Sequence, residues 1–158
     1  MYLWSNLPRL VLGLALTGVL ASCGTEDTPN LGTIEFAPTG IGLQLASNAG
    51  TVTFGTYARV TVRTPTGQPN TLATLRLAGV ICSGFVDLAA CAASPLNPTG
   101  VPVELEVDDR GGLDLTVIYS LTGGSEGEFT IVEGWSGPAY NRLNVTVECF
   151  EAGGVLCP

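Results

Sequence analysis

Apolar side chains occupy every second position over several separate segments of this chain. The clearest of these segments are residues 41–46, 59–63 and 143–148, in which polar residues fill the intervening positions. A period of two is typical of β-strands that bury one face and expose the other. Another strand is predicted from about Leu72 to Ile81, after the turn-forming residues Thr64–Asn70.

The stretch from Val101 to Ser120 predicts a β-hairpin, because its odd-numbered positions are apolar on both sides of a glycine pair. The two apolar faces coincide only if the loop holds an odd number of residues. The three residues Arg110 to Gly112 meet this condition and supply a glycine for the left-handed position of such loops. The expected cross-strand pairs are Val107 with Leu115, Leu105 with Val117, and Val103 with Tyr119.

The order of these elements predicts an all-β fold. About eight short strands alternate with turn signals, and only Phe85–Ala93 suggests one or two helical turns. This pattern favours a single antiparallel β-sandwich of about seven to nine strands. The sequence YARVTVRTPTGQP, followed by further alternating strands, resembles immunoglobulin-like and fibronectin type III-like modules of bacterial surface proteins over about Thr51–Phe150. The resemblance implies an immunoglobulin-like sandwich.

The start of the chain has the pattern of an export signal. Leu10 to Leu20 form an apolar run of about 11 residues, far shorter than the roughly 20 residues that span a bilayer as a helix. Arg9 precedes the run, and the small residues Ala21 and Ser22 follow it, as in cleaved secretory segments.

The sequence Leu20-Ala21-Ser22-Cys23 resembles the lipobox of bacterial lipoproteins. The resemblance implies cleavage before Cys23 and acyl chains on its thiol, with the lipid bilayer as partner. Gly24, rather than Asp, follows the cysteine, which favours the outer membrane over the inner one. The alternatives are an ordinary secretory signal with an incidental cysteine, or a cytosolic chain with an apolar start.

Three parts of the chain follow from this interpretation. Residues 1–22 are the predicted signal peptide, residues 23–33 the lipidated cysteine with a flexible tether, and residues 34–158 the sandwich domain. The mature chain would hold five arginines against 14 acidic residues, because Arg9 is removed with the signal peptide. This acidic balance opposes nucleic acid as a partner.

Histidine and lysine are both absent from the chain. Histidine is the commonest metal ligand and the usual acid-base group near neutral pH, and either residue would serve as base for a serine nucleophile. We therefore expect no cofactor and no enzymatic activity. The alternative is a glycan hydrolase that uses only Asp and Glu.

Four cysteines remain after Cys23 is assigned to lipid, an even number in an exported chain. They allow three pairings, of which we favour Cys82 with Cys91 and Cys149 with Cys157, because each closes a short loop of small residues. A zinc site is the alternative, but spacings of nine and eight residues do not suit its usual closely spaced cysteine pairs.

The sequence EGWSGPAYNR suggests a binding loop that presents Trp135, Tyr140 and Asn141. Exposed aromatic rings beside an amide suit a sugar or a peptide, so an envelope protein or glycan is a candidate partner. In the alternative, Trp135 caps the sandwich core and Tyr140 leads into the last strand.

Acidic residues cluster around the glycine pair at 111–112. Glu104, Glu106 and Asp108 alternate along one strand face, with Asp109 and Asp114 beside the turn. Clustered carboxylates suit calcium, which makes Asp108, Asp109 and Asp114 a weak candidate site. The alternative is a solvated face that keeps a sheet edge soluble.

Together these features predict a membrane-anchored envelope lipoprotein with a binding or structural role. One alternative is a subunit of a surface assembly that associates through an exposed strand edge. The other is the carboxylate-based hydrolase.

Overall fold

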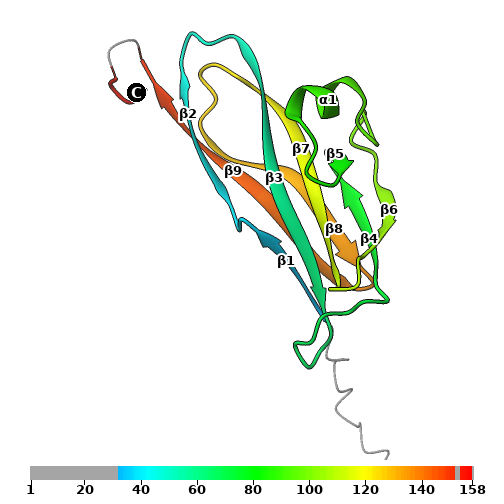
Figure 1. Ribbon diagram of the computed structural model, residues 1–158. Helices are drawn as coiled ribbons and strands as arrows, with labels where there is room; N and C mark the ends of the chain where they lie inside the picture. The colour runs from blue at the N-terminus through cyan, green and yellow to red at the C-terminus, as the bar shows by residue number, and fades with distance from the viewer. Residues whose placement is uncertain (1–31, 152–153, 158) are drawn as a thin grey trace, which may run out of the picture.

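Two β-sheets stack face to face in the computed structural model, which describes residues 32–151 and 154–157 (Figure 1). The four-stranded sheet contains, in spatial order, β1 (Thr33–Ala37), β3 (Thr51–Arg63), β7 (Gly112–Thr122) and β5 (Val80–Ser83). The five-stranded sheet contains β2 (Ile41–Ala46), β9 (Ala139–Phe150), β8 (Gly127–Ser136), β4 (Thr74–Ala78) and β6 (Val103–Glu106). The predicted all-β, immunoglobulin-like sandwich is confirmed.

The predicted signal peptide, Cys23 and most of the predicted tether lie outside the described residues. The first strand begins at Thr33, and the segment that forms it shows no long alternation of its own. It is held by β3, with Thr33 opposite Arg63 and Ala37 opposite Arg59.

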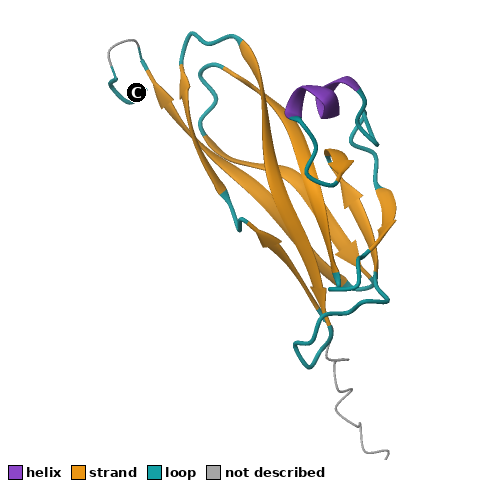
Figure 2. Cartoon of the chain, viewed as in Figure 1, coloured by secondary structure: helices purple, strands orange, loops and turns teal. Residues whose placement is uncertain are grey.

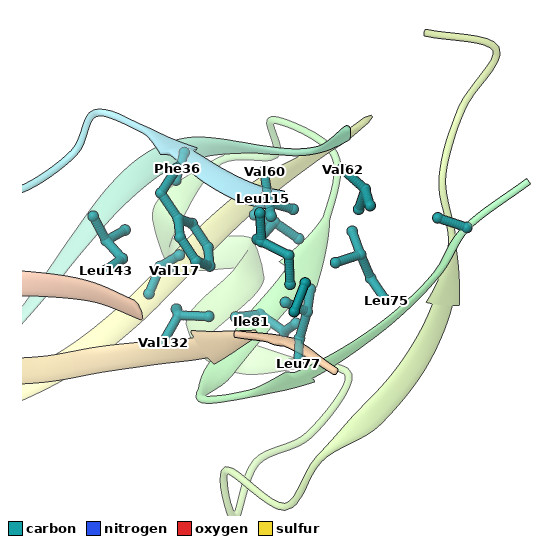
Figure 3. Packing of buried hydrophobic residues seen from close by; sticks show 14 residues of the cluster. Phe36, Val60, Val62, Leu75, Leu77, Ile81, Leu115, Val117, Val132 and Leu143 are labelled. Atoms are coloured by element: carbon teal, nitrogen blue, oxygen red, sulfur yellow. The ribbon is translucent and has the colours of Figure 1, made fainter. Parts of the chain in front are cut away.

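The core lies between the two sheets and is made by the apolar positions of the alternating pattern (Figure 3). Most strands bury every second side chain against the other sheet, whereas β7 buries Thr116 and Ile118 on its outer face as well. Complete burial of a Leu, Val or Ile side chain contributes roughly 1.5–3 kcal/mol. The side chains that are wholly removed from water include Val60, Leu75, Leu77, Ile81, Leu115, Val117, Leu143 and Val145.

One strand pair departs from the predicted antiparallel arrangement. The chain leaves the four-stranded sheet after β1 and joins the five-stranded sheet as β2, still running in the same direction. Its partner there is β9, which runs the same way, so this pair is parallel, with Ile41 opposite Val145. The two strands are almost 100 residues apart in sequence, so no local pattern reveals their direction.

The strand predicted from Leu72 to Ile81 is two strands, β4 and β5, in different sheets. Gly79 separates them with a φ of 139°, a conformation that side-chain-bearing residues rarely adopt. A Cβ atom there would also lie 2.6 Å from the carbonyl oxygen of Ile131. The glycine therefore lets the chain cross from one sheet to the other.

The hairpin predicted for residues 101–120 is wrong. β6 pairs with β4, placing Leu105 opposite Leu75, whereas β7 pairs with β3 and β5 in the other sheet. The turn after β6 is closed by a hydrogen bond from the Asp108 amide to the Gly112 carbonyl, 2.7 Å. The apolar side chains of β6 and β7 do contribute to the same core, but from opposite sheets rather than side by side.

Helix α1 (Leu88–Ala93) covers part of the outer face of the four-stranded sheet (Figure 2). Asp87 caps it by accepting hydrogen bonds from the amides of residues 89 and 90, and Leu88 packs over Gly55. A disulfide joins Cys91 of the helix to Cys82 of β5, and both residues are buried with Ile118. No helix in the described ranges is long and apolar enough to cross a membrane.

The second disulfide joins Cys149, near the end of β9, to Cys157. The structure thus contains both of the cysteine pairs favoured by the sequence. The segment that this second bridge holds is exposed, with Val155 and Leu156 at 65% and 60% exposure.

Candidate binding surface and acidic cluster

Trp135 and Tyr140 belong to a β-hairpin and not to the irregular loop predicted from the sequence. Trp135 lies opposite Tyr140 in the β8–β9 ladder, and Ser136 lies opposite Ala139. Only Gly137 and Pro138 connect the strands. Gly137 has a φ of 55° at the first central position, as a two-residue type II′ turn requires.

The two aromatic rings lie on the outer face of the five-stranded sheet. Their centroids are 5.5 Å apart, and the guanidinium carbon of Arg76 lies 5.7 Å from the centroid of Trp135. This spacing is within the range of a cation–π contact. The Tyr140 hydroxyl donates a hydrogen bond to Glu133, 2.8 Å away, and this carboxylate raises the pKa of Tyr140.

Asn141 does not join these rings, because successive strand residues point to opposite faces of a sheet. Its side-chain amide points inward and donates a hydrogen bond of 2.7 Å to the carbonyl oxygen of Ile34 in β1. Asn141 therefore ties the two sheets together. The alternative that Trp135 caps the core is wrong as well, since the ring lies outside the sandwich.

Arg76 was not identified from the sequence, although it alternates with the buried Leu75 and Leu77 in β4. The ladder places Glu104 opposite Arg76 and Arg76 opposite Trp135. A row of four side chains thus crosses β6, β4, β8 and β9, and we call it the aromatic row: Glu104, Arg76, Trp135 and Tyr140.

A shallow hollow of about 310 Å³ adjoins the aromatic row. Its lining includes Gly79, Gly100, Thr130 and Glu133. Glu133 links the two features, because it also accepts the hydrogen bond from Tyr140. The row and the hollow together offer two aromatic rings tilted by 40°, one positive and two negative charges, and a polar recess.

The acidic cluster is built around Arg59, which the sequence did not reveal as a partner. Its two terminal nitrogens each lie 2.7 Å from a carboxylate, one from Asp108 and one from Asp114. The other oxygen of Asp108 accepts hydrogen bonds from the amides of Arg110 and Gly112. These bonds, with the guanidinium first among them, lower the pKa of Asp108 to about 2.

The three residues of the weak calcium candidate therefore lie in different surroundings. Asp108 and Asp114 direct oxygens at Arg59, and Asp109 is exposed beside the turn. In the part of the chain that the structure describes, no three His, Cys, Asp or Glu residues are grouped so as to hold a metal ion. The observed arrangement fixes the turn between β6 and β7 and offsets the charge of Arg59.

Asp108 is also unsuited to act as the general acid of a hydrolase. A general acid must remain protonated near neutral pH, which requires a raised pKa. Glu104 and Glu106 are exposed on the edge strand β6. The acidic residues singled out in the sequence thus lie in a structural ion pair and on a solvated edge.

Comparisons with known proteins identify no family for this chain. No family model matches it, and no curated protein matches it. Among solved structures, it is similar to the ASH / PapD-like domain of human CEP192 (PapD-like domain 7). The sequence identity is 12% and the TM-score 0.38, over 78% of this chain and 89% of that domain.

Proposed function

We propose that this protein is a lipid-anchored lipoprotein of a bacterial cell envelope, with a binding or structural role. The observation that carries the proposal is the sequence Leu20-Ala21-Ser22-Cys23 directly after an apolar run of signal-peptide length. We further propose that the acyl chains on Cys23 attach the protein to the outer membrane rather than the inner one.

The cysteine chemistry of the sandwich supports export from the cytosol. All four remaining cysteines are joined in two disulfides. Such bonds form and persist in oxidising compartments and are rare where the cytosol keeps thiols reduced. The cross-links therefore agree with the compartment that the lipobox implies.

An acyl anchor suits a small domain of this kind. A single acyl chain holds a protein only reversibly, whereas two or three chains hold it stably at a bilayer surface. The nine residues from Gly24 to Gly32 reach at most about 30 Å when fully extended. The tether would then keep the sandwich within about 30 Å of the membrane surface, and the aromatic row of the sandwich is the surface that we propose for binding.

Metabolic labelling with radioactive palmitate tests the anchor. We expect label in the wild-type protein and none in Cys23→Ala, because the thiol that carries the acyl chain is missing. Gly24→Ala is the matched control, since it changes the neighbouring residue and keeps the thiol. Absence of label from the wild type, or equal labelling of Cys23→Ala, would overturn the proposal.

A further inference from the structure

The described chain begins at one end of the sandwich, which we call the N-terminal end (Figure 1). Thr33 pairs with Arg63 at the end of β3, and Thr61 pairs with Gly112 at the start of β7. The bond from Asn141 to Ile34 brings the start of β9 to the same place. The N-terminal end therefore comprises the connections 64–73, 107–111 and 137–138.

Charge is distributed unequally between the two ends. All five arginines of the described residues lie within about four strand residues of the N-terminal end, or roughly 13 Å. Seven acidic residues share that half with them, so its net charge is −2. The opposite end holds four acidic residues and no basic residue, and all four are exposed: Glu126, Glu128, Glu148 and Glu151. Asp87 lies near the middle of the sandwich, after Val86, whose amide bonds Thr116.

The N-terminal end also exposes residues that favour a membrane interface. Trp135 and Tyr140 lie one ladder pair from its 137–138 turn, and Tyr140 is 49% exposed. Leu72 is 93% exposed in the 64–73 connection. Trp and Tyr rings concentrate at the headgroup level of bilayers, where one part of the ring is apolar and another polar.

The opposite half exposes apolar side chains too, among them Val155 at 65%. The Glu151 amide donates a hydrogen bond to the Val155 carbonyl, and no arginine balances the Glu151 carboxylate in that half. Anionic lipid headgroups repel this half more strongly than the N-terminal half, because the five arginines of the N-terminal half offset most of its acidic charge. Charge rather than apolar exposure therefore distinguishes the two ends.

We propose, on the basis of the lipid anchor proposed above, that the N-terminal end of the sandwich rests against the anchoring bilayer. The partner of the aromatic row is then the headgroup region itself, which Trp135, Tyr140 and Leu72 contact, and the acidic half points away from the membrane. The tether keeps the domain at a high effective concentration near the surface, so a weak contact is sufficient to populate this orientation.

Tryptophan fluorescence tests the orientation directly. The chain has two tryptophans, Trp4 and Trp135, and only Trp135 remains after cleavage before Cys23. The mature acylated protein, with its acyl chains verified by mass spectrometry, is placed in vesicles of phosphatidylcholine and phosphatidylglycerol. We expect a nitroxide-labelled headgroup lipid to quench Trp135 by about twofold, because indole rings settle at that depth.

The matched control moves the single tryptophan to the other end of the sandwich in a Trp135→Phe/Val155→Trp variant. Val155 is 65% exposed, so ring accessibility is retained, and we expect little quenching there. A second variant, Leu72→Ser, should reduce the quenching of Trp135 without unfolding the protein, because Leu72 lies almost entirely in solvent.

The outcomes separate the two proposals. Palmitate incorporation with equal quenching at positions 135 and 155, or with stronger quenching at position 155, overturns the orientation and leaves the anchor intact. Failure of palmitate incorporation overturns both. Quenching confined to position 135 in the acylated protein supports the orientation.

Discussion

The two disulfides close loops of nearly equal length, nine and eight residues in sequence separation, yet we expect their removal to have different effects. Loop-closure entropy alone assigns each of them about 2.5 kcal/mol of stabilisation, by restricting the unfolded chain. A difference between the two must therefore come from the folded state.

In Cys82→Ala/Cys91→Ala the folded segment should keep its position. Leu88 packs over Gly55, and the Val86 amide donates a hydrogen bond of 2.9 Å to Thr116. The folded state thus regains little entropy, and it also loses two sulfur atoms from residues only 7% and 1% exposed. Loss of that buried volume adds roughly 1–2 kcal/mol, for a total of about 4 kcal/mol.

In Cys149→Ala/Cys157→Ala the exposed C-terminal segment should fray without opening the sheet. Backbone hydrogen bonds from the Glu151 amide to the Val155 carbonyl and from the Cys157 amide to the Cys149 carbonyl hold it, but the side chains of Val155 and Leu156 are exposed. Without the bridge, both the folded and the unfolded chain gain conformational entropy. The entropy that the frayed segment gains in the folded state offsets most of the entropy that the unfolded chain gains. We expect a net loss of about 1 kcal/mol.

Equilibrium urea unfolding of the mature protein in detergent, without reductant, measures both free energies through Trp135 fluorescence and circular dichroism. Equal losses of unfolding free energy in the two double variants would refute the reasoning. They would mean that the bridges stabilise the protein only by restricting the unfolded chain. A larger loss for the C-terminal pair would refute it more strongly.

Three further changes test the contacts described above. Gly112→Val should lower the free energy of unfolding by about 2–3 kcal/mol, because its Cβ would lie 2.9 Å from the carbonyl oxygen of Val60, a backbone atom that cannot turn away. Gly42→Val, with open space around it, should change this free energy by less than about 0.5 kcal/mol, and equal effects of the two substitutions in thermal unfolding would contradict the close approach. Thr116→Val keeps the buried shape but leaves the Val86 amide without its partner, so urea unfolding should show a loss of about 1–3 kcal/mol, and an unchanged midpoint would count against that bond. The folded pKa of Asp108, about 2, is below its ordinary value of 3.8, so its contribution is complete above pH 3.8 and is lost as the pH falls toward 2. Over that interval the melting temperature of Asp108→Asn should fall less steeply than that of the wild type, and parallel curves would exclude the role given to Arg59.

Local pattern alone was sufficient to predict the fold class. Residues 143–148 alternate as a half-buried strand must, and they lie within β9. The cysteine pairs could be predicted for a similar reason, since short sequence separations bring the two thiols near each other in many folds. These features depend on neighbours within about ten residues.

The local pattern did not predict which strands are neighbours in a sheet. Alternation in residues 101–120 shows which side chains are buried, and it is the same whether β6 and β7 lie side by side or face each other across a core. The two strands lie in different sheets here. β6 pairs with β4, which places Leu105 opposite Leu75, and β7 pairs with β5, which places Val117 opposite Ile81. The order of the strands depends on the apolar surface that both sheets bury together. The pattern of a single segment does not reveal this total.

The candidate binding surface, too, was predicted only in part from the sequence. The sequence alone drew attention to Trp135, Tyr140 and Asn141 through residue type, but only the ladder register placed the two rings outside and the amide inside. Arg76 reaches Trp135 from another strand, and Arg59 reaches Asp114 from 55 residues away. A sequence determines which side chains are available for such contacts, whereas tertiary structure decides which of them meet, because pairing between strands joins residues that no local periodicity connects.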